Sequence, residues 1–415
     1  LSYLIDAVKY AIETLYDEQK GLFGSDTVGE TTLKGSIFFG YDSVDGSIDP
    51  YRCPNENRNG KGVVYCYSLY QNVNMYNVLR MMEVLVKASP DLDLASAVAF
   101  RTLADQLGER IVECFPGDSG HYKAGLLVLE DGEQLWIEDF RELDLWEYAW
   151  AVSLGPFYPD LGLALASSRF VMEEWPKTGT YGLCPWNTLS RLLKQYVLDD
   201  LAFEHMLEVE FRDALTYTET YPMVGATTEY AHAPHPFRGL PFSTGSLLYT
   251  LHACVLQSLP LGLAIRGSKY ADQVSRFQYR NARIDVSSIG DGEAVGSWSM
   301  NGSVVLGTLQ IPESKLYHGK NKVEITRAAA HTEPRLFSST AILLEVEADD
   351  FHYVYQFRCP TACELIFENF EHATGLSIYD DNGAISCEVK RLEDTFKTQI
   401  RFNCGEAVTV ELKLR

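Results

Sequence analysis

Apolar residues recur mainly at helical spacing up to about residue 265. Val78, Met81 and Leu85, for example, stand at positions i, i+3 and i+7, which share one face of a helix. The pattern predicts helices near residues 2–18, 63–88, 94–115, 142–154, 159–174, 187–196, 198–214 and 244–259. The first part of the chain is therefore expected to be helical.

The pattern changes from about residue 279 onward. Short strand-like runs alternate with turn signals such as Asp291-Gly292 and Asn301-Gly302. The runs are 282–287, 304–311, 322–327, 340–346, 352–357, 362–367, 385–390, 396–402 and 408–414. Strands at this spacing predict an antiparallel β-sandwich. We therefore expect a helical domain at 1–265, a linker at 266–278 and a C-terminal β-domain at 279–415.

Charge and cysteine usage narrow the class of protein. The chain has 35 basic and 57 acidic residues, a net charge of -22, whereas nucleic-acid binding requires a basic surface. Nine scattered cysteines, an odd number, predict reduced, buried thiols and no disulfide framework. No stretch is long and apolar enough to span a bilayer. We expect no nucleic-acid or membrane partner, and the oligomeric state stays open.

The start of the chain carries a further expectation. Leu1 opens directly inside a helical pattern, so we expect the natural protein to begin further upstream. A cytoplasmic and a periplasmic location both remain open, with the thiols reduced.

Two connectors between the predicted helices are long. Residues 19–62 and 215–243 are rich in Gly, Ser, Asp, Asn or Pro, and they contain no convincing helix. Loops of this length in a compact domain are usually functional or disordered. Their many aromatic residues argue against disorder, so both connectors are candidates for a functional site.

Several segments share their pattern and order with a known group of enzymes. They are DEQKGLFGSDTVGE at 17–30, DLWEYAWAVSLG at 144–155, YPMVGATTEY through PFSTGSLL at 221–248, YRNA at 279–282 and HGKNKVEI at 318–325. Together they resemble the six-hairpin glycosidases, in particular the branch of bacterial glycogen-debranching and α-L-rhamnosidase-like hydrolases. The likeness covers most of the chain.

The resemblance implies an (α/α)6-type toroid of helical hairpins followed by an antiparallel β-sandwich. Such toroids have twelve helices. The pattern here predicts fewer, which implies that the first third of the ring precedes this chain. In that family the connectors corresponding to 19–62 and 215–243 carry the catalytic acid and base.

Glycoside hydrolysis uses two carboxyl groups, about 6.5–9.5 Å apart when the reaction inverts the anomeric centre. The resemblance assigns the base to Glu229, which otherwise reads as an ordinary solvent-facing glutamate. For the acid, two residues stand level. Glu30 matches the family's Gly-Glu-Ser/Thr step, but Leu33-Lys34-Gly35 replaces the usual Leu-Asp-Trp. Asp42 follows aromatic residues that would raise its pKa, although it also suits a turn.

Other residues are candidates for holding the sugar. Trp136 could stack on a ring, with Glu138 or Asp139 bonding hydroxyls, but Asp139 with Glu142 also forms a helix-capping box. Trp186 is either a tryptophan that faces the sugar-binding cleft or a core tryptophan at the start of a helix. Tyr230, His232 and Arg238 accompany Glu229 along its connector.

The sequence thus predicts a glycosidase that hydrolyses an α-linked oligo- or polysaccharide with inversion. The histidines form no His-x3-His or His-Glu-x-x-His pair, so neither a catalytic metal nor an organic cofactor is expected. Alternatives on the same fold are a polysaccharide lyase using Tyr230 and His232, a phosphorylase, or a non-catalytic carbohydrate-binding relative.

Overall fold

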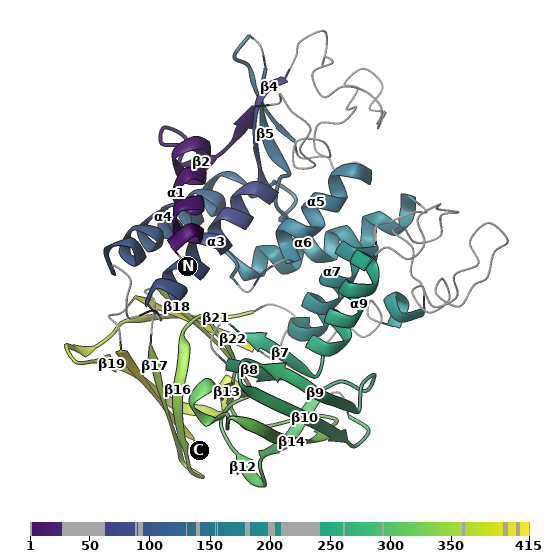
Figure 1. Cartoon of the computed structure of the whole chain (residues 1–415), viewed down its shortest axis with the longest axis vertical. Coiled ribbons are helices and arrows are strands. Elements are labelled where there is room, and N and C mark those ends of the chain that lie inside the picture. Colours follow the sequence, from purple (N-terminus) through teal and green to yellow (C-terminus); the bar gives the residue numbers. More distant parts are fainter. Residues whose placement is uncertain are drawn as a thin grey trace, which may run out of the picture. The chain divides into compact units, whose positions relative to one another are not determined.

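A computed structural model of the chain shows two compact units (Figure 1). The first comprises Leu1–Leu193 and Asp199–Leu247, and the second comprises Lys194–Leu198 and Leu248–Arg415. The structure describes residues 2–26, 63–87, 89, 94–129, 131–137, 142–153, 155, 157–178, 183–197, 204–208, 241–259, 262–292, 294–358, 362–392, 397–403 and 407–414.

Helices make up most of the described part of the first unit. They are α1 (Ser2–Leu15), α3 (Leu69–Lys87), α4 (Leu94–Cys114), α5 (Glu142–Ser153), α6 (Leu161–Glu174), η1 (Trp175–Thr178), α7 (Leu183–Val197), a short helix at 204–208, and α9 (Pro241–Ala253), which continues into the second unit. Asp160 begins α6 as an N-cap, because its carboxylate accepts a hydrogen bond from Leu163 N at 2.9 Å.

Helices α3 and α4 form a hairpin. The buried face of α4 carries Ala97, Phe100, Ala104 and Leu107, which recur at helical spacing. Gly108 allows close approach, since a Cβ there would lie 2.9 Å from a ring carbon of Tyr76 on α3.

The first unit also contains two small antiparallel sheets. One is the hairpin of β1 (Tyr16–Asp17) and β2 (Leu22–Phe23). The other has four strands in the order β3-β4-β5-β6, and we call it the N-terminal sheet. Its strands are β3 (Ser25–Asp26), β4 (Val63–Ser68), β5 (Gly125–Leu129) and β6 (Gln134–Ile137).

The expected helical toroid is wrong. Seven α-helices of 12 to 21 residues and a short helix lie in the described part of the chain, and no ring of hairpins is evident among them. Part of the region predicted as helix, 63–68, forms β4 instead. The run Val-Val-Tyr-Cys-Tyr-Ser is apolar on both faces, and periodicity alone does not separate such a strand from a buried helix.

The second unit is built from β-sheets, in agreement with the predicted β-rich C-terminal region. A three-stranded sheet has the order β13-β8-β7, and a five-stranded sheet has the order β12-β11-β14-β10-β9. The strands are β7 (Leu256–Leu259), β8 (Gly262–Ile265), β9 (Gln273–Tyr279), β10 (Ala282–Ile289), β11 (Ala294–Met300), β12 (Ser303–Val305), β13 (Gln310–Pro312) and β14 (Gly319–Ala328). The β10–β14 pair is parallel, which departs from the antiparallel expectation.

The remaining strands of the second unit form two antiparallel sheets that share one core. Their orders are β15-β18-β22-β21 and β16-β17-β23-β19-β20. The strands are β15 (Arg335–Ser339), β16 (Ile342–Ala348), β17 (His352–Arg358), β18 (Ala362–Glu368), β19 (Ala373–Asp380), β20 (Gly383–Ala384), β21 (Cys387–Arg391), β22 (Lys397–Asn403) and β23 (Ala407–Leu414). The core includes Tyr355 of β17 against Phe367 of β18, with ring centroids 5.5 Å apart. Side chains from both sheets fill it, as in a β-sandwich.

None of the helices in the described part of the chain combines the length and apolarity needed to cross a bilayer.

Gly262 starts β8 with φ at +139°, and a Cβ there would lie 2.6 Å from the carbonyl oxygen of Ile311. We expect Gly262→Ala to lower the free energy of unfolding by about 3 kcal/mol, because it adds a backbone clash to the strain. Gly383 is a matched control: its φ is +124°, but a Cβ added there would meet no atom within 4 Å. Urea denaturation should show a smaller loss, about 1 kcal/mol, for Gly383→Ala; equal losses would contradict the clash.

Candidate functional site

Most of the predicted site residues lie outside the described residues. They are Glu30, Asp42, Glu138, Asp139, Glu229, Tyr230, His232 and Arg238. Trp136 and Trp186 lie within them. What the structure does show is how the chain is held on either side of the segments that carry the candidate carboxylates.

The N-terminal sheet holds both ends of segment 27–62, which carries Glu30 and Asp42. Strand β3 enters this segment and β4 leaves it, and the two strands are paired directly, with Ser25 opposite Cys66. Strand β6 of the same sheet leads into 138–141, which carries Glu138 and Asp139. One sheet therefore holds both flanks of the segment with Glu30 and Asp42, and one flank of the segment with Glu138 and Asp139.

The first segment of the resemblance begins with DEQKGLF, which forms a tight turn. Asp17 Oδ1 accepts hydrogen bonds from Gln19 N at 2.9 Å and Lys20 N at 3.2 Å. Gly21 has φ at +66°, which favours glycine. Leu22 and Phe23, which follow, are buried. The motif thus has a structural role in turning the chain toward β3.

The side chain of Asn72 on α3 holds this turn by hydrogen bonds. Its buried side chain accepts a hydrogen bond from Phe23 N at 2.8 Å and donates to Phe23 O at 2.9 Å and to Ser68 O at 2.8 Å. Phe23 lies just before segment 27–62 and Ser68 shortly after it. One amide therefore bonds the chain on both sides of the segment.

Aromatic side chains gather on one face of the N-terminal sheet. Tyr67, Leu126 and Trp136 are successive cross-strand partners, so their side chains share a face. Tyr65 lies two residues from Tyr67, and the two rings meet edge to face at 5.2 Å. Trp136 is half-buried, with Lys123 Nζ 5.1 Å from its ring centroid. A half-buried indole with an ammonium group beside it has the character of a side chain that stacks on a sugar ring.

Asp17, in the β1–β2 hairpin, is a carboxylate that contacts Tyr67 of this sheet and stays ionised. The Tyr67 hydroxyl donates to its Oδ2 at 2.5 Å. That bond, together with the backbone N–H donors of the turn, lowers the pKa of Asp17, while burial opposes the shift. Burial and the neighbouring carboxylate raise the pKa of Tyr67. An ionised, fully engaged carboxylate does not deliver a proton to a leaving group.

Helix α7 holds both flanks of segment 209–240, which carries Glu229. Its Trp186 ring lies 6.0 Å from His205, which precedes the segment. Its Asn187 Nδ2 donates to Ser246 Oγ on α9 at 2.8 Å, after the segment. Trp186 is 2% exposed and also packs 6.4 Å from Trp175. The structure therefore places Trp186 in the interior of the unit, beside the chain that leads to Glu229.

Helix α5 connects these two frameworks. Ser153 Oγ, near the end of α5, lies 2.7 Å from Thr188 Oγ1, and Arg191 Nη2 donates to Ser153 O at 3.0 Å, so α5 is fixed to α7. Trp150 of α5 lies 6.1 Å, ring to ring, from Tyr70 of α3. A continuous set of side-chain contacts thus runs from the N-terminal sheet through α3 and α5 to α7, all within the first unit.

Glu83 of α3 is a buried carboxyl group that the sequence did not single out. It is 0% exposed, and burial raises its pKa against the opposing effect of Lys87 and Arg80. Lys87 Nζ lies 3.2 Å from it and Arg80 3.7 Å. Because two cations flank it inside the α3–α4 hairpin, its role is structural. Among the described residues, no group of His, Cys, Asp or Glu side chains could hold a metal ion.

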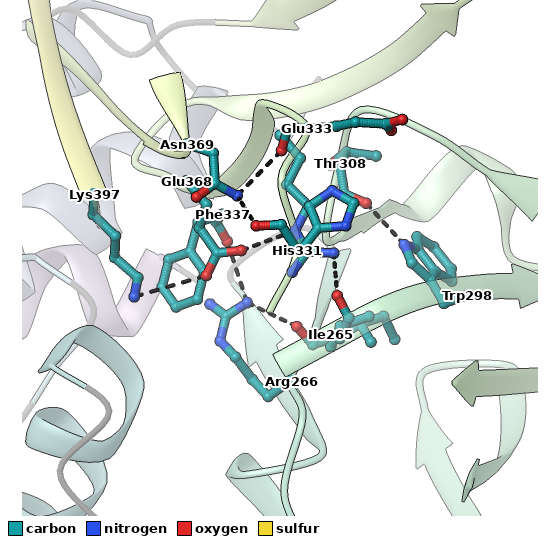
Figure 2. Close-up of polar contacts among 12 residues, drawn as sticks. Ile265, Arg266, Trp298, Thr308, His331, Glu333, Phe337, Glu368, Asn369 and Lys397 are labelled. Atoms are coloured by element: carbon teal, nitrogen blue, oxygen red, sulfur yellow. Dashed lines mark hydrogen bonds and ion pairs between the residues drawn. The ribbon is translucent and has the colours of Figure 1, made fainter. Parts of the chain in front are cut away.

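A second buried charge cluster lies in the C-terminal unit, and Figure 2 shows most of it. Glu368 accepts from Arg335 Nε at 2.8 Å and lies 3.7 Å from Lys397 Nζ. Burial raises the pKa of Glu368, but Arg335 and Lys397 outweigh it and hold the pKa below its usual value. Lys397 and Arg266 also lie 4.5 and 3.9 Å from the Phe337 ring centroid. Glu368 is therefore ionised and paired, as in a structural cluster.

The sequence did not predict this cluster. Arg335, Glu368 and Lys397 stand in three different strands, β15, β18 and β22, which are neighbours only in the folded sheet. Alternation along each strand puts these three residues on the face opposite the core residues Leu336, Phe367 and Ile400. Charged residues at such positions are usually read as solvent-facing, so the sequence gives no sign of their burial.

No protein-family model matches the chain, and no curated protein matches its sequence. Among solved structures, the crystal structure of a GH78 family rhamnosidase of Bacillus sp. GL1 is similar, with a TM-score of 0.37 and 13% sequence identity. The similarity covers 69% of this chain and 29% of that protein. The chain thus spans less than a third of the length of that glycoside hydrolase.

Burial lowers the pKa of Lys397 to about 8, with Glu368 opposing and Arg266 and Arg335 adding to the shift. The folded-state pKa lies below the unfolded one, so protonated Lys397 disfavours folding at neutral pH, and this penalty falls as pH rises above about 8. Between about pH 7.5 and about pH 9.5 we expect wild type to gain about 2 kcal/mol relative to Lys397→Met.

Urea denaturation of both proteins at the two pH values measures this difference. Lys390→Met on the neighbouring strand β21 removes an exposed lysine and should track wild type. If the difference in unfolding free energy between wild type and Lys397→Met does not change with pH, burial does not lower the pKa of Lys397.

Proposed function

We propose that this chain carries the active site of a glycosidase that hydrolyses an α-glycosidic bond of an oligo- or polysaccharide with inversion. The observation that carries the proposal is the anchoring of the two candidate segments. Segment 27–62 is held on both flanks by the N-terminal sheet and Asn72, and segment 209–240 on both flanks by α7. Rigid elements that hold two carboxylate-bearing segments within one unit are the support that a two-carboxylate mechanism needs.

The roles follow from the chemistry of the reaction. Glu229, as an ionised base, takes a proton from water while that water attacks the anomeric carbon. A protonated carboxyl group, Asp42 or Glu30, gives its proton to the leaving oxygen as the glycosidic bond breaks. The products are a sugar with a free reducing end and a leaving part with a free hydroxyl group. The base has gained one proton and the acid has lost one.

Two described carboxyl groups of the same unit are already engaged by other residues. Asp17 is ionised and hydrogen bonded by Tyr67, and Glu83 is enclosed by Lys87 and Arg80. Neither suits the acid or the base, which favours the carboxyl groups of the anchored segments.

Sugar binding is proposed to fall to side chains beside these carboxyl groups. Trp136 is half-buried on the N-terminal sheet and lies next to segment 138–141, so its ring would stack on the substrate while Glu138 and Asp139 bond hydroxyls. Tyr230, His232 and Arg238 would bond the sugar near Glu229. Trp186, being 2% exposed, would act by holding α7 against the chain that leads to Glu229.

Glu229→Gln should lower kcat for hydrolysis of aryl α-glycosides by about 100- to 10,000-fold, because the amide cannot take a proton from water. Glu208→Gln is the matched control, since Glu208 is an exposed glutamate that closely precedes the same segment. Circular dichroism confirms that both variants are folded. The proposal fails if Glu229→Gln cleaves as fast as the control. It also fails if wild type hydrolyses none of the aryl α-glycosides and instead breaks the glycosidic bond by elimination or with phosphate.

Leaving-group dependence should separate the two candidate acids. A dinitrophenolate leaves without help from a proton, whereas an alkoxide does not, so loss of the acid affects only poor leaving groups strongly. We expect one of Asp42→Asn and Glu30→Gln to hydrolyse dinitrophenyl glycosides within about tenfold of wild type and to lose at least about 100-fold on alkyl glycosides. Equal losses on both substrate types, in both variants, would exclude the pair as general acid.

A further inference from the structure

A cavity of about 410 Å³ lies within the C-terminal unit, between the β11–β12 hairpin, the loop at 313–318 and strand β16. Its volume falls in the range of small-molecule sites. Trp298 of β11 lines it and is held in place because its Nε1 donates to Thr308 O at 2.8 Å, as Figure 2 shows. None of the residues proposed for catalysis belongs to this unit.

An exposed aromatic ring borders this cavity on a fixed loop. Tyr317 is 64% exposed, yet its backbone is held by the buried side chain of Asn321. Asn321 Oδ1 accepts from Tyr317 N at 2.9 Å, and its Nδ2 donates to Tyr317 O at 2.9 Å. A buried amide is thus used to hold a tyrosine that is itself left facing solvent.

The same asparagine connects two walls of the cavity. Asn301, in the turn of the β11–β12 hairpin, donates from Nδ2 to Asn321 Oδ1 at 3.3 Å. On the opposite side, Ser314 Oγ donates to Leu344 O at 3.1 Å, and Lys315 Nζ lies 3.0 Å from Glu345, both on β16. The loop that carries Tyr317 is therefore fixed at both ends, which lowers the entropy cost of binding a ligand against it.

Gln310 contributes a polar group to the cavity. It is 2% exposed, and its Oε1 accepts from Ser339 Oγ at 3.1 Å. Its Nε2 is buried and has no hydrogen-bond partner among the described residues. The contact with Ser339 therefore fixes this amide as a polar part of the cavity wall.

The chemistry of the walls defines the ligand. Ile311, Val346 and Ala348 are apolar, Tyr317 offers a ring, and Asn301 and Gln310 offer amides. The charge of Lys315 is paired with Glu345. A ligand that suits these walls is neutral, ring-shaped, apolar on its faces and rich in oxygen at its edge. A sugar residue has this character.

We infer that this cavity binds a neutral saccharide unit, with the Tyr317 ring stacked on the sugar. The choice of a sugar over other neutral rings rests on the proposed function, whereas the cavity and its fixed loop do not. The C-terminal unit would then hold a saccharide at a site separate from the catalytic carboxyl groups.

Isothermal titration of the whole chain with a panel of neutral mono-, di- and oligosaccharides tests this inference. Wild type should bind at least one of them, and Tyr317→Ala should weaken that binding by about tenfold or more through loss of stacking. Tyr317→Phe keeps the ring and should bind nearly as wild type. Tyr10→Ala, which removes another exposed tyrosine (69% exposed) from α1 in the first unit, should leave binding unchanged.

Hydrolysis measured on the same proteins keeps the two proposals apart. Tyr317→Ala should cleave small aryl α-glycosides at the wild-type rate, because Tyr317 has no part in the chemistry. Tyr317-dependent binding without any hydrolysis would support this site and refute the glycosidase. Binding that is equally tight in Tyr317→Ala, or no binding by wild type, would overturn the saccharide site whatever the hydrolysis shows.

Discussion

Two buried asparagine side chains hold irregular stretches of the described chain to neighbouring helices and strands. Backbone N–H and C=O groups that leave a helix or strand must still find partners when they are buried. Asn72 supplies them to Phe23 and Ser68, and Asn321 supplies them to Tyr317. An amide carries a donor and an acceptor on one short side chain, so a single side chain can bond both the N–H and the C=O of another residue. Each such bond contributes only about 1 kcal/mol, but leaving the groups unpaired is worse.

Contacts of this kind also flank the two predicted connectors that carry the candidate carboxyl groups. Segment 27–62 runs from the Asn72-bonded turn to β4, and segment 209–240 lies between two contacts of α7. Long connectors can carry varied chemistry when their ends are rigid, because the framework rather than the connector supplies the stability. The same arrangement recurs on a smaller scale at the loop that carries Tyr317. Function is expected on such segments, and packing is expected beneath them.

Sequence periodicity located most helices within a few residues, but it failed for a segment that is apolar on both of its faces. Helix α4 was predicted at 94–115 and runs from Leu94 to Cys114, because only one of its faces is apolar. Strand β4 was mistaken for the start of α3, since Val63–Ser68 lacks alternation. That error, together with the unpredicted strands β5 and β6, hid the N-terminal sheet, whereas the toroid was expected from the family resemblance. For the site, Glu229 and Glu30 were nominated through the resemblance, and Asp42 through its aromatic neighbours in the sequence. Hydrogen bonds such as that of Asn187 to Ser246, 59 positions apart, leave no local signal.

The buried charges of the two units show why a carboxyl group in the interior is not by itself a catalytic acid. Glu83 and Glu368 are both deeply buried, yet burial raises the pKa of one, while two cations keep the pKa of the other low. In each case at least one cation lies within 3.2 Å of the carboxyl group. The carboxyl group is held by that cation and does not bind a substrate. A general acid needs the raised pKa of the first kind without the cations that enclose it. Aromatic neighbours can provide this, because they desolvate a carboxyl group and add no charge. The two candidate acids differ in this respect in the sequence, because Asp42 follows Phe38, Phe39 and Tyr41, whereas Glu30 is followed by two threonines.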